Sequence, residues 1–218
     1  MSKPKQSMEK RLLRAQVIID GILGNPEIMA LLEPWGYTEA KLQALRALYQ
    51  EALDLVAKQK AEYGEQYEAT AEVQAVWDTA DKAYIRTLKI ARIALRGDGA
   101  AATALMLTGR RDRTLSGWLH QTTIFYQNLL ARPDWIAAVG EFGYDQARLE
   151  AEAALVQTVA ETNVVQEREK GEAQEATKLR DDKMNELDQK IADLQVVVEM
   201  ALEEHPQWLE QLGFGPVP

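Results

Sequence analysis

The chain contains no cysteine among its 218 residues. Disulfide bonds, thiol nucleophiles, iron–sulfur clusters and thiolate zinc sites are therefore excluded. It has only two histidines, and neither stands three residues after a glutamate, as the ligands of a carboxylate-bridged two-metal helical bundle do. Motifs for a nucleophile elbow, a phosphate-binding loop or a dinucleotide fold are also missing. These absences predict a protein that is not an enzyme and that needs no cofactor.

Glycine and proline are scarce, with 13 and 7 residues, and runs of alternating β-branched residues are missing. Strands and hairpins show such alternation, so no strand is predicted. The abundant residues are alanine, leucine, glutamate, glutamine and lysine, which favour helices. Apolar residues make up 46% and charged residues 27% of the chain, a globular composition. The predicted fold class is all-α.

Positive charge is in the minority. The 25 lysines and arginines face 34 aspartates and glutamates, which gives a net charge of −9. Nucleic acids and anionic lipids attract basic surfaces, so nonspecific binding to either is disfavoured. The longest apolar run near the start is interrupted by Asp20, which predicts neither a signal peptide nor membrane insertion. We expect a cytoplasmic protein whose partner is a second copy, in a homo-oligomer, or another protein.

The sequence repeats itself after 107 positions. Residues 26–96 align without a gap with residues 133–203 and share 20 identities in 71 positions. A repeat of this size determines the symmetry of a fold. We therefore predict two tandem copies of a roughly 100-residue helical unit, at 1–107 and 108–218, related by a pseudo-twofold in one intertwined domain.

Each copy shows the same helix signals. A first helix, at about 8–23 or 115–130, precedes a proline that suits the first turn of a short second helix. A glycine then ends that helix, and Thr38 or Asp145 can cap a long helical segment. The repeat thus predicts a short helix, a shorter one and a long one, in that order.

The long segments raise a question at Gly64. Apolar residues recur at seven-residue intervals from Leu42 to Ala91, and their phase does not change at this glycine, whereas a turn would normally reset it. A glycine inside a helix costs only about 1 kcal/mol. The pattern favours continuous antiparallel helices over 38–96 and 145–203, in an elongated bundle. The alternative is a helical hairpin at each glycine, which gives a compact four-helix bundle.

The polar residues around this glycine recur almost unchanged in the second copy. Because a merely solvated segment should diverge, we interpret them as a candidate interface or helix crossing. They are Gln59, Glu62, Gly64, Glu65, Glu68 and Thr70, with Gln166, Glu169, Gly171, Glu172, Glu175 and Thr177. Glutamates three apart lie on one helix face, so binding of a divalent cation such as Ca²⁺ is an alternative.

Arg110, Arg111 and Arg113 form the one dense basic cluster in the sequence. They are a candidate contact for an anion or an acidic partner, and a solvated loop is the alternative. The tryptophans are expected to pack in the core. The matching turns "WGY" at 35–37 and "FGY" at 142–144 are expected to plug the ends of the bundle.

Two strings, "LTGRRDRTLSGWL" at 107–119 and "EKGEAQEATKLRD" at 169–181, resemble segments of an uncharacterised bacterial family of internally duplicated all-helical proteins. The resemblance covers most of the chain. It implies a bacterial, soluble, helical protein, and it implies no activity, cofactor or catalytic residue.

These features together predict a non-enzymatic helical-bundle scaffold or protein-interaction protein that associates with itself. The alternative function is a helical bundle that binds a small ligand or a divalent cation at the repeated acidic segment.

Overall fold

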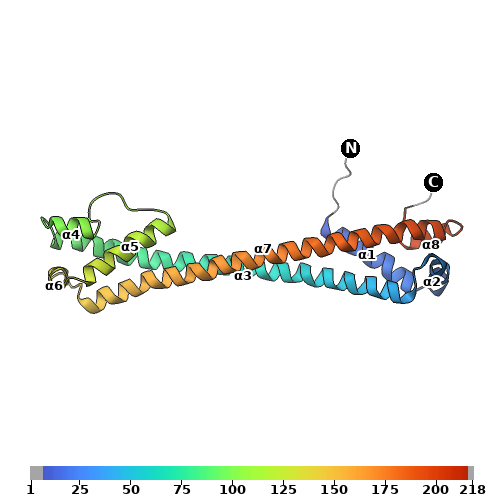
Figure 1. Cartoon of the computed structure of the whole chain (residues 1–218), viewed down its shortest axis with the longest axis horizontal. Helices are drawn as coiled ribbons and strands as arrows, with labels where there is room; N and C mark the ends of the chain where they lie inside the picture. Colours follow the sequence, from blue (N-terminus) through green and yellow to red (C-terminus); the bar gives the residue numbers. More distant parts are fainter. Residues whose placement is uncertain (1–6, 216–218) are drawn as a thin grey trace. The chain divides into compact units, whose positions relative to one another are not determined.

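Residues 7–215 are described by a computed structural model, and their regular structure is entirely helical. The helices are α1 (Met8–Leu23), α2 (Pro26–Leu32), α3 (Glu39–Ala94), α4 (Gly99–Ala104), α5 (Leu115–Leu130), α6 (Pro133–Gly140), α7 (Gln146–Ala201) and α8 (Pro206–Gln211), with the 3-10 turn η1 (Glu33–Trp35) after α2 (Figure 1). The predicted all-α fold class is confirmed.

The two long helices are unbroken. α3 and α7 have 56 residues each, and Gly64 and Gly171 lie inside them. The flanking residues are good helix formers, so one exposed glycine does not end the helix. The prediction of continuous helices is confirmed, and the hairpin alternative is wrong.

Helix starts in the two halves of the chain follow a fixed spacing. Each of α5 to α8 begins 107 residues after the corresponding member of α1 to α4. Gly36 and Gly143 share the same spacing, and both adopt the left-handed conformation, at φ 79° and 80°. Such a φ favours glycine, so the chain reverses direction in the same way after α2 with η1 and after α6.

Polar side chains cap the helix starts where the sequence predicts caps. Thr38 Oγ1 accepts from the backbone N–H of Lys41, and Asp145 Oδ1 accepts from that of Arg148. Thr114 Oγ1 accepts from the N–H of Gly117 at the start of α5. These bonds satisfy helix N–H groups that have no partner within the helix, which determines where each helix begins.

The chain forms two compact units. Unit 1 comprises Met1–Tyr63 and Glu172–Pro218, and unit 2 comprises Gly64–Gly171. Each unit takes one part of α3 and one part of α7, so the division differs from the predicted sequence repeats at 1–107 and 108–218. Those repeats remain a prediction.

Unit 1 has an aliphatic core. α1, α2 and α8 gather beside the segments of α3 and α7 that belong to this unit (Figure 1). Lys183 on α7 pairs with Glu51 on α3 at 3.2 Å, and Arg11 Nε on α1 donates to Asp188 on α7 at 2.7 Å. Its fully buried large side chains include Ile18, Ile19, Ile22, Ile28, Leu32 and Leu42 from α1 to α3 and Met184, Leu187, Leu194 and Leu202 from α7 and the residue that follows it. α8 adds Leu209, and the residue that follows this helix, Leu212, is also buried.

Unit 2 has an aromatic core. α4, α5 and α6 gather beside its segments of α3 and α7 (Figure 1). Phe125 meets Tyr84 and Tyr126 edge to face, with ring centroids 5.3 and 5.1 Å apart. Trp118 and Trp135 are also buried. Edge-to-face pairs of this kind stabilise a core beyond the area that they bury.

The aromatic residues before the two turn glycines are exposed, at 50% for Trp35 and 46% for Phe142. The expectation that the turns at 35–37 and 142–144 plug the ends of the bundle is therefore wrong for these two rings. Tyr37 and Tyr144, which follow the left-handed glycines, are buried instead. The reversal at glycine turns the residue after it toward the core and leaves the residue before it outside.

Among the described residues, no single helix has the length and apolarity to cross a membrane. One bent pair, Met8–Leu23 with Pro26–Trp35 at 95°, passes that test by length and composition.

Candidate functional site

The repeated polar segment lies within α3 and α7. Of its residues, unit 1 holds Gln59, Glu62, Glu172, Glu175 and Thr177, and unit 2 holds Gly64, Glu65, Glu68, Thr70, Gln166, Glu169 and Gly171. Most are exposed, whereas Gln166 and Glu169 are buried. Within unit 2, Gln166 Nε2 donates to Thr70 Oγ1 at 3.0 Å, which joins α7 to α3. The role of the wider set as an interface remains a prediction.

The two glycines of this segment have free space around them. A Cβ added at Gly64 or Gly171 meets no atom within 4 Å beyond the local helix. Neither glycine is therefore required for a close approach of backbones in this structure.

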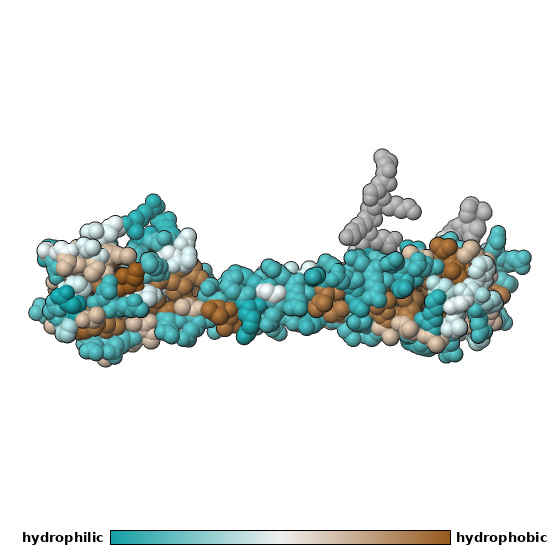
Figure 2. Space-filling model, in the orientation of Figure 1, coloured by the Kyte–Doolittle hydropathy of each residue, from teal (hydrophilic) through white to brown (hydrophobic). Residues whose placement is uncertain are grey.

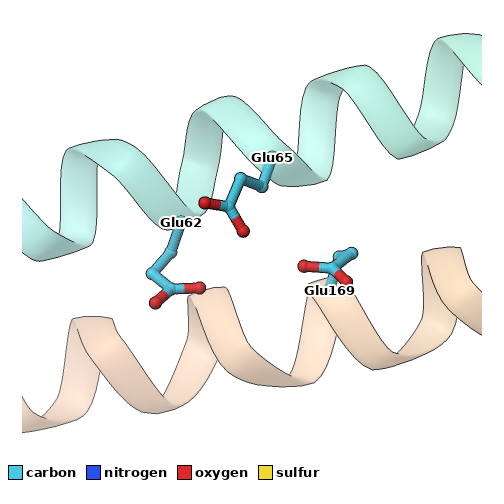
Figure 3. A group of neighbouring side chains, drawn as sticks. All are labelled: Glu62, Glu65 and Glu169. Carbon is cyan, nitrogen blue, oxygen red and sulfur yellow. The ribbon is translucent and has the colours of Figure 1, made fainter.

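Glutamates approach one another in the same region. Glu65 on α3 and Glu169 on α7, both in unit 2, each offer a carboxylate oxygen within 4.8 Å of the other, and Glu62 lies one turn before Glu65 (Figure 3). Arg168 Nη2 donates to Glu169 at 2.7 Å and offsets part of this negative charge. Ca²⁺ takes 6–8 oxygen ligands, which carboxylates, carbonyls and waters can share. The cation site remains a prediction.

The three predicted arginines lie together in the loop between α4 and α5. Arg110, Arg111 and Arg113 line one cleft of about 290 Å³ in unit 2, together with Trp77, Asp81, Asp112 and Trp118. We call it the arginine cleft. Residues from α3, α5 and the loop thus meet at one site, although they lie far apart in the sequence.

Asp81 holds two walls of the arginine cleft in place. One of its oxygens accepts from Arg111 Nη1 at 3.2 Å and from Trp118 Nε1 at 2.7 Å. Trp77 packs edge-on against Trp118, with centroids 5.9 Å apart. The indole N–H and the guanidinium both satisfy this carboxylate, so one of the three arginines is already paired.

Asp112, the second carboxylate of the cleft, accepts hydrogen bonds from a residue of its own loop. It accepts from the backbone N–H and the hydroxyl of Thr114, at 2.9 and 2.8 Å. The bond from the backbone N–H of Thr114 is the main reason that the pKa of Asp112 is lowered from its ordinary value. The carboxylate therefore stays charged while it stabilises the turn into α5.

Arg110 and Arg113 are exposed, and neither forms an ion pair with another residue of the described range. The loop is nevertheless attached to the unit, since Arg92 Nε donates to the carbonyl of Leu107 at 2.7 Å. A larger open cleft of about 540 Å³ adjoins the first and shares the three arginines and Asp112. Met106, Gly117, His120 and Gln121 complete its lining.

A buried polar network in unit 2 was not predicted. Glu152 on α7 accepts from Tyr126 at 3.0 Å and from Thr87, while its other oxygen accepts from Arg148 Nε at 3.2 Å. Burial, followed by the nearby charge of Glu152, raises the pKa of Tyr126 far above its ordinary value. The hydroxyl therefore stays protonated and donates to the carboxylate.

The repeat itself contained a signal for this network. At a spacing of 107, the network residues Glu152, Tyr126 and Thr87 of unit 2 correspond to Leu45, Ile19 and Leu194 of unit 1. All three residues of unit 1 are buried and apolar. A charged residue aligned with a core leucine indicates either exposure or a paired buried charge, and the structure shows the second.

The two histidines lie in different surroundings. His120 is exposed on α5 at the larger cleft. His205 stacks on Trp208, with centroids 4.3 Å apart, and precedes α8.

Comparisons of the chain with protein-family models, with curated proteins and with solved structures find no match.

Proposed function

We propose that this protein is a non-enzymatic helical scaffold that binds other protein molecules, and that a second copy of the chain is one of them. The proposal is supported chiefly by the exposure of Tyr67 and Val164. These are the most exposed large apolar side chains of the described residues, at 71% and 70%. Both lie on the long helices of unit 2.

The short helices cover only part of the long ones. α5 has 16 residues, and it meets α3 at Asp81 and α7 at Glu152 through side-chain hydrogen bonds. Tyr67 and Val164 lie beyond these contacts, in a part of unit 2 where Gln166 on α7 donates to Thr70 on α3. Figure 2 shows small hydrophobic patches that interrupt a mostly hydrophilic surface.

A second pair of helices can bury these side chains. Full burial of a large apolar side chain contributes about 1.5–3 kcal/mol. Two helical pairs that pack face to face form a four-helix arrangement, a common way to bury such residues. Exposed apolar residues on the pair therefore favour association of two copies through α3 and α7.

We further propose that the two sequence repeats, at 1–107 and 108–218, are duplicated copies related by a pseudo-twofold, in an elongated bundle. The 20 shared identities and the common spacing of helix starts support this. One pair of contacts supports it as well. Trp118 donates a hydrogen bond to Asp81, and Arg11 donates one to Asp188. The two acceptors are 107 positions apart, and so are the two donors. Small-angle scattering from an elongated particle agrees with the proposal, and a compact particle contradicts it.

Sedimentation velocity of the full chain tests self-association. The unmodified protein should associate as its concentration rises. Tyr67→Ser with Val164→Ser should weaken association by more than about tenfold, since each side chain contributes over 1.4 kcal/mol when buried. The matched control is Leu13→Ser with Val196→Ser, which removes two other exposed apolar side chains in unit 1. The proposal is contradicted if both double variants weaken association equally, or if neither of them changes it.

A further inference from the structure

We infer that the arginine cleft of unit 2 binds an acidic peptide segment of a partner protein, one that carries glutamate or aspartate next to an apolar residue. The inference rests on the proposed function, because it names the class of partner for a scaffold. It concerns a surface distinct from Tyr67 and Val164, so it can fail separately from self-association.

The charges of the cleft favour a carboxylate ligand. Asp81 already accepts two hydrogen bonds from within the unit, and Asp112 is bonded by Thr114. Neither carboxylate pairs with Arg110 or Arg113 in the described structure. Two guanidinium groups are therefore available, and each presents donors in a planar fork that matches a carboxylate.

The shape of the site favours an extended chain over a small anion. The arginines line two adjoining clefts, of about 290 and 540 Å³, which are both open to solvent. Small-molecule sites usually enclose most of their ligand. A peptide that crosses the loop can place carboxylates beside Arg110 and Arg113 on both sides.

The walls supply an apolar contact as well. Trp77 is half-buried and lines the smaller cleft, and Met106 lines the larger one. An apolar residue between two acidic ones can lie against either side chain. Charge and apolar contact together define the peptide more narrowly than charge alone.

Among the described residues, the arginine cleft has no counterpart in unit 1. The arginine loop follows α4 and precedes α5, and it connects the two copies of the repeat. The position that matches Trp118 is Arg11, which is already paired with Asp188. The inferred site is therefore single, and one peptide should bind per chain.

Fluorescence anisotropy tests the inference on the full chain. The probe is a labelled peptide in which pairs of glutamates alternate with leucines. A matched peptide has glutamine at every glutamate, and free glutamate and inorganic phosphate serve as small anions. We expect the acidic peptide to bind with one site per chain and to weaken as salt rises. The glutamine peptide should not bind, and neither small anion should compete at millimolar concentration.

Arg110→Gln with Arg113→Gln should weaken binding by about tenfold or more, since charge-assisted bonds are lost. The matched control is Arg86→Gln with Lys89→Gln, which removes two exposed charges from α3 in the same unit and outside the cleft. The inference is overturned if the acidic peptide does not bind, if both double variants weaken it equally, or if phosphate displaces it.

Sedimentation of the same proteins separates the two proposals. A chain that associates but binds no peptide contradicts only the inference about the cleft. A chain that binds the peptide but stays monomeric contradicts only self-association. Arg110→Gln with Arg113→Gln should leave self-association unchanged, and a loss of association in this variant contradicts the separation of the two surfaces.

Discussion

The two units fill the same helical framework with different chemistry. Tyr84, Phe125, Tyr126 and Trp135 of unit 2 correspond, at the 107-residue spacing, to isoleucines 191, 18, 19 and 28 of unit 1. Both sets are buried. A framework of one medium and two short helices beside parts of two long helices therefore accepts either an aliphatic core or an aromatic one with polar bonds.

Polar groups show the sharper difference. Unit 2 buries the carboxylate of Glu152 with two hydroxyls, whereas unit 1 places two leucines and an isoleucine at these positions. Replacement of a buried charge by well-packed apolar residues is often neutral or stabilising. Unit 1 folds without such a network, which indicates that the framework does not require it.

The largest effect is expected at the position shared by Trp118 and Arg11. Trp118→Ala should lower the free energy of unfolding by about 4 kcal/mol, since it removes a buried indole and leaves a cavity. Arg11→Ala should cost about 1 kcal/mol or less, because its ion pair with Asp188 is partly exposed to solvent. Urea titration of both variants measures the difference, and equal losses contradict the proposed contrast between the units.

The buried network gives the next largest effect. Glu152→Leu should cost about 2–3 kcal/mol, because the hydroxyl of Tyr126 loses its acceptor. Adding Thr87→Val and Tyr126→Phe removes the unpaired groups as well, so the triple variant should recover at least part of that loss. Thermal and urea unfolding compare the two. A triple variant less stable than Glu152→Leu shows that unit 2 depends on its polar core.

Substitution of glycine should have opposite effects on stability in the two long helices and in the two turns. Gly64→Ala and Gly171→Ala should each raise the free energy of unfolding by about 1 kcal/mol, since both sites are helical and have free space. Gly36→Ala and Gly143→Ala should lower it by about 1 kcal/mol, because φ is positive there. A loss of stability at Gly64 or Gly171 would mean that the glycine serves a close contact.

The smallest effect expected is a loss of stability at low pH, when Asp98 is protonated. Asp98 caps α4 in unit 2. The residue 107 positions later, which precedes α8 in unit 1, is His205. The hydrogen bond from the backbone N–H of Ala101 is the main cause that lowers the pKa of Asp98. The folded pKa is below the unfolded one, so this stabilisation is present at neutral pH and is lost as the pH falls through the folded value.

Asp98→Asn retains a capping oxygen but does not titrate. The gap in melting temperature between the unmodified protein and this variant should therefore shrink from pH 7 to pH 3. A gap that stays constant over that range shows that Asp98 does not contribute through its charge.

Much of the fold followed from local sequence patterns. The unbroken apolar phase from Leu42 to Ala91 predicted a continuous α3, and Thr38 and Asp145 were recognised as caps. These features depend on residues close in the chain, so periodicity and propensity suffice to predict them. The clustering of Arg110, Arg111 and Arg113 was visible for the same reason.

Contacts between residues far apart in the chain could not be predicted from these local patterns. The bonds of Asp81 to Trp118 and of Glu152 to Thr87 join different helices. A helical pattern predicts which face is buried, but it does not predict which side chain of another helix lies opposite. The exposed position of Trp35 was missed because its apolar ring suggested burial, whereas the left-handed Gly36 leaves it outside.

The most direct measurement for the proposed scaffold is the mass of the full chain in solution, by light scattering over a concentration series. A single chain has a mass of 24.5 kDa. We expect a mass that rises with concentration toward a multiple of this value. A mass that stays at 24.5 kDa at every concentration would show that copies of this chain do not bind one another.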